Sequence, residues 1–217
     1  METLLKTNSC TKRWYPHSVE EFKCSILIPN DSEDNKRYNS NFAYSMQYLQ
    51  YIEKQLGELE LSSVIITMLY KNYIITGMGI VEMLFTYILK TTNNWNTTDW
   101  IEIQTFKSNP TTLDENQFKT ETTLFKKVES YDMRMDLDSM IKRIEKKHLI
   151  SIDHSDFPAL KQLRELRNRV HLQSGESAYD HDGSNEFKLM KRILYSILTA
   201  PEICKNKRAF DFIKIEE

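Results

Sequence analysis

The sequence predicts a mainly α protein: a bundle of about five helices that carries a small β-hairpin insertion. Apolar residues recur at helical spacing through most of the region 39–200, and only the stretch 92–131 alternates as strands do. The 217 residues are 40% apolar and 28% charged, with only 5 glycines and 5 prolines. That composition is typical of one soluble globular domain with few tight turns.

Three regions follow one another along the chain. Residues 1–38 form an N-terminal segment, in which alternation over 22–28 predicts a short strand. Residues 39–200 form the helical bundle, with the β insertion at about 92–131. Residues 201–217 form a C-terminal tail, whose alternating last part predicts either a strand or a docked segment.

Each helix of the bundle has its own apolar pattern. The first begins near Asn39 and ends near Gly57, and its apolar face has three- and four-residue spacing: Phe42, Met46, Leu49, Ile52 and Leu56. The region 61–90 is apolar on nearly every face, which predicts a helical pair or one long helix in the middle of the bundle. Three more helices are expected, at about 135–144, 156–173 and 184–198.

The insertion contains two alternating stretches rich in strand-forming residues, at 100–106 and 118–125. Loop signals surround them, including Asn109–Pro110 between the two stretches. They predict a hairpin with a long tip. A hairpin inserted between helices could also serve as a docking surface, so a purely structural interaction protein is one candidate function.

The cysteines bear on the cellular compartment. Cys10, Cys24 and Cys204 are an odd number without CxxC spacing, which excludes a disulfide framework or a zinc cage. The N-terminus lacks the apolar stretch of a signal peptide. Together these observations predict a cytoplasmic protein.

Charge and hydropathy exclude other classes. The formal net charge is -2, from 29 Lys and Arg against 31 Asp and Glu, so the chain does not coat duplex nucleic acid by bulk charge. The most apolar region, 62–89, is interrupted by Lys71, Asn72 and Glu82, so no membrane contact is expected. P-loop, dinucleotide-binding, nucleophile-elbow and zinc-protease motifs do not occur.

The helix expected at about 156–173 carries the chemically informative residues. At 100° per residue, its core stripe consists of Ala159, Leu163, Leu166 and Val170. A second stripe beside it holds Arg164, Arg167, Asn168 and His171. Leu160 lies on this second stripe as well, which suggests that a partner surface covers it.

These residue types suit chemistry on a phosphate. His171 lies near the end of its helix, where the dipole favours the imidazolium and the two arginines oppose it, so it can titrate near neutrality and transfer protons. Arg164 and Arg167 can bind a phosphate and stabilise developing charge. Asn168 can hydrogen-bond the histidine or the substrate. A solvated helix face is the alternative interpretation.

The run 166–171, Leu-Arg-Asn-Arg-Val-His, resembles the signature helix of the HEPN superfamily of helical nucleotide-binding and RNA-cleaving domains. The family pattern is an arginine, usually followed by a polar residue, with four to six residues before a histidine. The run 77–85, small residues followed by Glu82, is similar to a core helix of these bundles. Three residues separate Arg167 from His171 and six separate Arg164 from it, but Glu165 follows Arg164. Either arginine can therefore be the partner of His171.

The resemblance implies metal-independent cleavage of single-stranded RNA by a homodimer, with no cofactor. His171 would be the acid or base in attack of the ribose 2′-hydroxyl on phosphorus, and Arg167 or Arg164 would stabilise the phosphate. Arg169 and Lys161 would contact the RNA backbone. Such a protein would be a toxin or phage-defence effector with a cognate antitoxin or defence-system partner. The alternative is a non-catalytic module that binds nucleotide, RNA or protein.

Two expectations concern supporting and metal-binding groups. Glu82 lies in an apolar segment and needs a cationic partner, and an arginine of the signature helix would let it orient the site. His148, His154 and His181 lie near several aspartates, but their spacing matches no zinc motif, so we expect no metal site.

Overall fold

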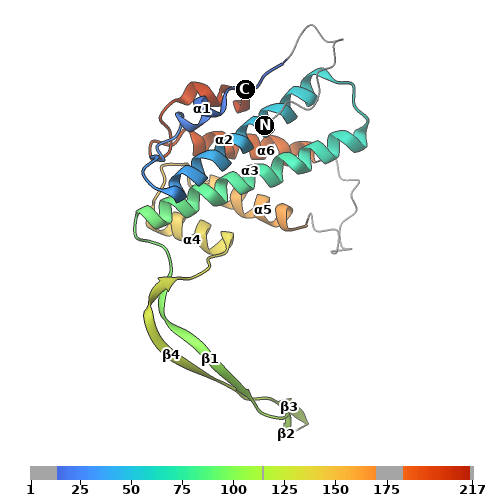
Figure 1. Ribbon diagram of the computed structural model, residues 1–217. Helices are drawn as coiled ribbons and strands as arrows, with labels where there is room; N and C mark the ends of the chain where they lie inside the picture. The colour runs from blue at the N-terminus through green and yellow to red at the C-terminus, as the bar shows by residue number, and fades with distance from the viewer. Residues whose placement is uncertain (1–13, 114, 170–182, 216–217) are drawn as a thin grey trace, which may run out of the picture.

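The structure is a computed structural model that describes residues 14–113, 115–169 and 183–215. In the described part of the chain the elements are α1 (Val19–Lys23), α2 (Glu33–Glu58), α3 (Ser63–Thr91), β1 (Thr97–Lys107), β2 (Thr111–Leu113), β3 (Asn116–Phe118), β4 (Glu121–Asp132), α4 (Leu137–Lys147), α5 (Asp156–Arg169), α6 (Ser184–Leu198) and the 3-10 helix η1 (Lys207–Ile213). Figure 1 shows α2 to α6 as a bundle from which the strands project. The predicted mainly α architecture with a hairpin insertion is confirmed; among the described elements, α3 to α6 lie within 39–200, and α2 begins earlier, at Glu33.

Helix α3 lies at the centre of the bundle and contacts α2, α4, α5 and α6. It is one long helix rather than a pair. Its buried side chains begin at Tyr73, whereas Val64, Ile65 and Met68 in its first turns are exposed. The prediction of a fully central helix therefore holds only for the part that the other helices surround.

Within the described residues, α3 is the one helix long and apolar enough to cross a membrane. Only 33% of its most apolar stretch is buried, but α3 packs against four helices and carries Glu82 in an ion pair with Arg167. Core helices of soluble proteins share this length and composition. The arrangement is compatible with a soluble protein.

Both ends of the described chain differ from the strands that their alternation predicted. Residues 19–23 form α1, capped by the Ser18 hydroxyl, and only Ile26 makes an isolated bridge, with Cys204. The tail forms η1, with Ala209, Phe210 and Ile213 buried. The tail is thus docked rather than a strand. Neither segment has a sheet edge to join, because the only longer strands described lie in the distant arm.

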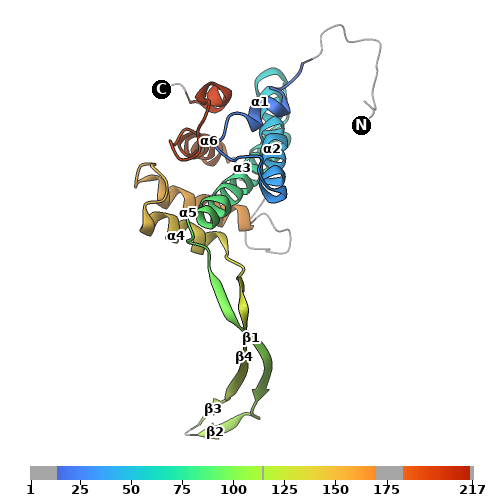
Figure 2. The same cartoon turned by 60° about the vertical axis from the view of Figure 1, so that its left-hand side comes forward.

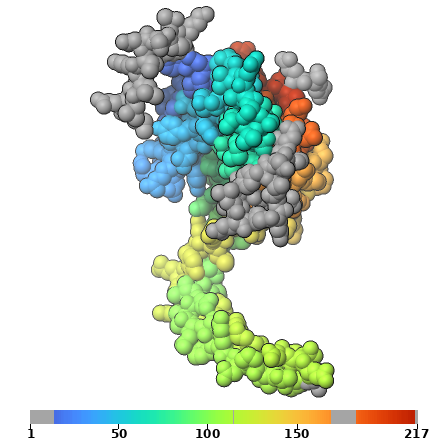
Figure 3. Space-filling model, turned by 90° about the vertical axis from the view of Figure 1, so that its right-hand side faces the viewer, coloured from blue at the N-terminus to red at the C-terminus, as the bar shows by residue number. Residues whose placement is uncertain are grey.

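The hairpin arm, residues 97–132, projects from the bundle beyond α3 and α4 (Figures 2 and 3). Strands β1 and β4 pair antiparallel with two register irregularities, and β2 pairs with β3 at the tip. Large apolar side chains on the arm are exposed: Trp100, Ile103, Phe106, Leu113, Phe118, Leu124, Phe125 and Tyr131. The predicted hairpin with a long tip is confirmed.

A close helix contact explains one of the small residues before Glu82. A Cβ atom at Gly77 would lie 3.0–3.1 Å from three side-chain atoms of Met190 on α6, whereas at Gly79 nothing lies within 4 Å. Gly77 therefore lets α3 and α6 approach each other.

Matched alanine substitutions should show this difference. We expect Gly79→Ala to raise the free energy of unfolding by about 0.5–1 kcal/mol through helix propensity. We expect Gly77→Ala to lower it by about 1 kcal/mol, because the displaced Met190 costs more than the propensity gain. Urea denaturation followed by circular dichroism measures both, and equal changes would contradict the close contact.

Candidate functional site

The site is built on α5, which contacts α3, α4 and α6. Its buried side chains include Phe157, Leu160 and Leu163. Leu160 is completely buried by the chain itself, so the suggestion that a partner covers it is wrong. The buried face is rotated toward Leu160 relative to the stripe that the helical wheel predicted, while Ala159 and Leu166 are only partly buried.

Three cationic side chains of α5 each pair with a carboxylate from a neighbouring helix. The nitrogen-to-oxygen distances are 2.8 Å for Arg167–Glu82, 3.3 Å for Arg164–Asp138 and 2.9 Å for Lys161–Glu145. We call these three ion pairs the α5 ladder. Its six charges balance, so it is not a free cationic groove.

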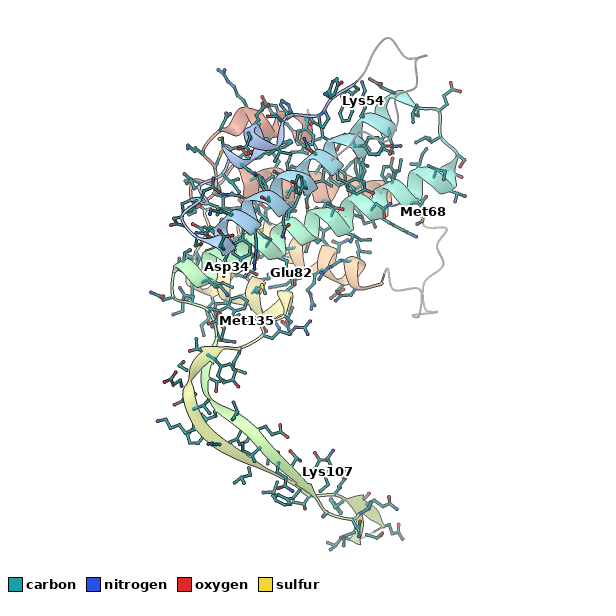
Figure 4. The ribbon with its side chains drawn as sticks, viewed as in Figure 1. Asp34, Lys54, Met68, Glu82, Lys107 and Met135 are labelled. Atoms are coloured by element: carbon teal, nitrogen blue, oxygen red, sulfur yellow. The ribbon has the colours of Figure 1, made fainter. Side chains whose placement is uncertain are left out.

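The Arg167–Glu82 pair is the most open part of the ladder that involves an arginine. Each of its side chains is 33% exposed, whereas Arg164 and Asp138 are 24% and 22% exposed. Figure 4 labels Glu82 on the part of α3 that lies above α5. The expectation that Glu82 pairs with an arginine of the signature helix is met, and that arginine is Arg167. A guanidinium has five N–H donors, and the contact with Glu82 uses its Nη2.

The other predicted site residues are placed as follows. Asn168 is exposed next to Arg167. Lys161 lies six residues before Arg167, about 9 Å along the helix axis. Arg169 is the last described residue of α5, and only its helical backbone is described. His171, the proposed acid or base, lies outside the described residues, and so does His181.

Arg164 is tied into the bundle more deeply than Arg167. Its Nη2 faces Asp138, which also bonds Lys142 at 2.5 Å, and its Nε is buried without a hydrogen-bond partner among the described residues. Packing of this kind suits a positioning role. Arg167 is better placed to contact an external phosphate.

The carboxylates on α4 were missed at the sequence level. Asp138 and Glu145 are seven residues apart, so they lie on one stripe beside the apolar residues of α4. That seven-residue spacing is the feature of the sequence from which the two carboxylates could have been found. The cap of α4 holds this stripe in place: Asp136 accepts a hydrogen bond from the Ser139 backbone N–H at 2.7 Å, which lowers the pKa of the Asp136 carboxyl.

A second polar cluster joins α2, α3 and α6. Lys191 bonds Glu53 at 2.9 Å, and both lie near Tyr73. Burial raises the pKa of the Glu53 carboxyl and raises that of the Tyr73 hydroxyl well above its usual value. These groups hold three core helices together.

Among the described residues no group of three His, Cys, Asp or Glu side chains could hold a metal ion. His148 ends α4 in a left-handed conformation, and His154 is an exposed loop residue whose Nδ1 lies 3.7 Å from Glu145. Comparison of the chain with protein-family models, with curated proteins and with solved structures finds no match. A function must therefore be argued from the residues of α5 and their surroundings.

Proposed function

We propose that the chain is a HEPN-like endoribonuclease that cleaves single-stranded RNA without a metal ion. The observation that carries the proposal is the Arg167–Glu82 pair at the C-terminal end of α5. It places a half-buried, oriented guanidinium beside the exposed Asn168, four positions before His171. A cation held in this way can stabilise charge on a phosphate without rearranging during the reaction.

In this mechanism the roles follow from side-chain chemistry. His171 transfers the proton to or from the attacking 2′-hydroxyl or the leaving oxygen. Arg167 binds the phosphate, Asn168 hydrogen-bonds the histidine or the RNA, and Arg164 positions the helix through Asp138. Two copies meet across α5, as the resemblance implies, in a cytoplasmic toxin or defence effector whose antitoxin or defence partner controls it.

A second candidate, a non-catalytic HEPN-like binding module, has one observation in its favour. Three cations of the signature helix, Lys161, Arg164 and Arg167, are in ion pairs within the chain. A site whose cations are already neutralised attracts RNA less strongly than a free basic groove. Such a module would bind nucleotide, RNA or a protein at the exposed end of the α5 ladder.

Cleavage of a mixed single-stranded RNA pool in EDTA tests the proposal. We expect the wild type to cut and His171→Ala to lose cutting while it keeps its helical circular dichroism spectrum. His154→Ala is the matched control, because it removes an exposed loop histidine.

Each outcome has a definite meaning. Cutting by His171→Ala would exclude the proposed proton transfer. No cutting by any variant, together with RNA binding by the wild type, would support the binding module. Cutting only when EDTA is omitted would overturn the metal-independent mechanism.

A further inference from the structure

The outer face of α2 carries a row of seven side chains that no described helix or strand covers. Its members recur at alternating intervals of four and three residues, and we call them the α2 seam: Arg37, Asn41, Tyr44, Tyr48, Tyr51, Gln55 and Glu58. Six of them are exposed and Gln55 is half-buried; at one end the Tyr51 ring lies 6.4 Å from the ring of Trp14. The three tyrosines are 61%, 42% and 45% exposed. The opposite face of α2 supplies core residues. Intervals of four and three are those with which one helix packs along another.

The seam is nearly symmetric about its centre, with opposite charges at its two ends. Arg37 and Glu58 are equally far from the point between Gln47 and Tyr48, and Tyr44 and Tyr51 are equally far from it as well. Asn41 and Gln55 match to within one residue. A copy of α2 packed antiparallel on this row would bring tyrosine to tyrosine, amide to amide, and Arg37 to Glu58 at both ends.

We infer that the α2 seam is a self-association surface, whose occupant is α2 of a second copy of this chain in antiparallel orientation. A two-fold interface must be complementary to itself, and opposite charges at equal distances from its centre provide this. Figure 4 labels Asp34 and Lys54, which mark the two ends of the helix. The row from Arg37 to Glu58 is about 32 Å long.

Charge argues against nucleic acid as the occupant. The run from Ser40 to Ile52 contains no charged residue. Surfaces that stack bases on aromatic side chains also need cations along the backbone, and the middle of the seam offers none. Tyrosine and amide side chains, by contrast, are well suited to protein interfaces, where they combine apolar area with hydrogen bonding.

The charged ends are free to change partner. Arg37 lies 3.8 Å from Asp34 and Glu58 pairs with Lys54, in contacts exposed to solvent. Exposed pairs of this kind contribute little, so exchanging them for pairs across an interface is easy. Because the seam is narrow, we expect a dissociation constant in the micromolar range.

This interface differs from the one in the proposed function. Helix α3 lies between α2 and α5 in both ribbon views (Figures 1 and 2), and α2 contacts α1 and α3. An α2 interface therefore leaves the α5 ladder uncovered. Its existence does not depend on RNA cleavage.

Charge reversal in the full-length protein tests the pairing. Arg37→Glu alone and Glu58→Arg alone should each weaken self-association by about tenfold in sedimentation velocity, since each places like charges together at both ends. Fluorescently labelled Arg37→Glu should bind Glu58→Arg at least as tightly as wild type binds itself. The double variant should also associate like wild type.

Tyr48→Glu tests the centre of the seam, where it would place two carboxylates together and abolish association by α2. Tyr131→Glu is the matched control, because Tyr131 is 44% exposed on the hairpin arm.

A monomeric wild type at micromolar concentrations would overturn the inference. So would association that is insensitive to the single reversals, which would assign it to another surface, or failure of the two single variants to bind each other. RNA binding that Tyr48→Glu removes without changing association would instead assign the seam to RNA.

Discussion

Arg167→Ala should lower the rate of RNA cleavage by a factor of at least about 100, which corresponds to about 2.7 kcal/mol of transition-state stabilisation. Its guanidinium is the half-exposed cation at the end of α5, and Glu82 holds it from 2.8 Å. Glu82→Gln keeps the size of the side chain but removes its charge, so Arg167 loses orientation and the rate should fall by about tenfold. Single-turnover cleavage of a labelled RNA measures both changes.

A double charge reversal separates catalysis from structure. In Glu82→Arg combined with Arg167→Glu, the ion pair can re-form with the cation on α3, so thermal stability should be closer to that of wild type than in Arg167→Ala. Cleavage should nevertheless stay low, because the guanidinium has moved. Recovery of cleavage in the double variant would contradict a direct role of Arg167.

Arg164→Ala decides between the two arginines. We expect it to reduce stability more than cleavage, because Arg164 bonds Asp138 and its Nε is buried. A larger loss of cleavage in Arg164→Ala than in Arg167→Ala, at equal folded fractions, would make Arg164 the phosphate-binding residue.

Asp156→Ala should lower the free energy of unfolding by about 3 kcal/mol. The Asp156 side chain is only 3% exposed; its Oδ1 lies 2.6 Å from Arg192 Nη1, and the Ser196 hydroxyl donates to its Oδ2 at 2.7 Å. Removing the carboxylate leaves two donors of α6 without their partner and releases the start of α5 from that helix. Chemical denaturation followed by circular dichroism measures the loss.

Asp153→Ala is the control for this prediction. Asp153 accepts a hydrogen bond from the Ser155 N–H in the same turn, but it lies at the surface. Its removal should change stability far less than that of Asp156. Similar losses in the two variants would show that local turn structure, and not the link to α6, is what Asp156 supplies.

The fold was largely predictable because its signals are periodic. The spacing in 184–198 gave α6 with its observed bounds, and the alternation in 100–106 and 118–125 gave the paired strands of the arm. Boundaries were less predictable. Helix α2 begins at Glu33, six residues before the expected start, because the Ser32 hydroxyl caps it by accepting a bond from the Asn35 N–H.

The candidate site was predictable in its residue types and less so in its contacts. The charge of Glu82 in an apolar segment required a cationic partner, and Arg167 is that partner. The bonds from the Asp156 carboxylate to Arg192 and Ser196 of α6 could not be read from local spacing. Asp138 and Glu145 were missed, because a partner across a helix interface depends on which helices become neighbours.

The sequence by itself determined the helical class, the hairpin insertion and the concentration of Arg, Asn and His in one segment, because these depend on local spacing and composition. Only the tertiary structure decided that Leu160 is covered by its own chain and that Lys161, Arg164 and Arg167 meet carboxylates of α3 and α4. The tertiary structure also decided the conformation of the short alternating segments at the two ends of the described chain. Alternation favours a strand only where a partner strand lies within reach, and here helices surround both segments.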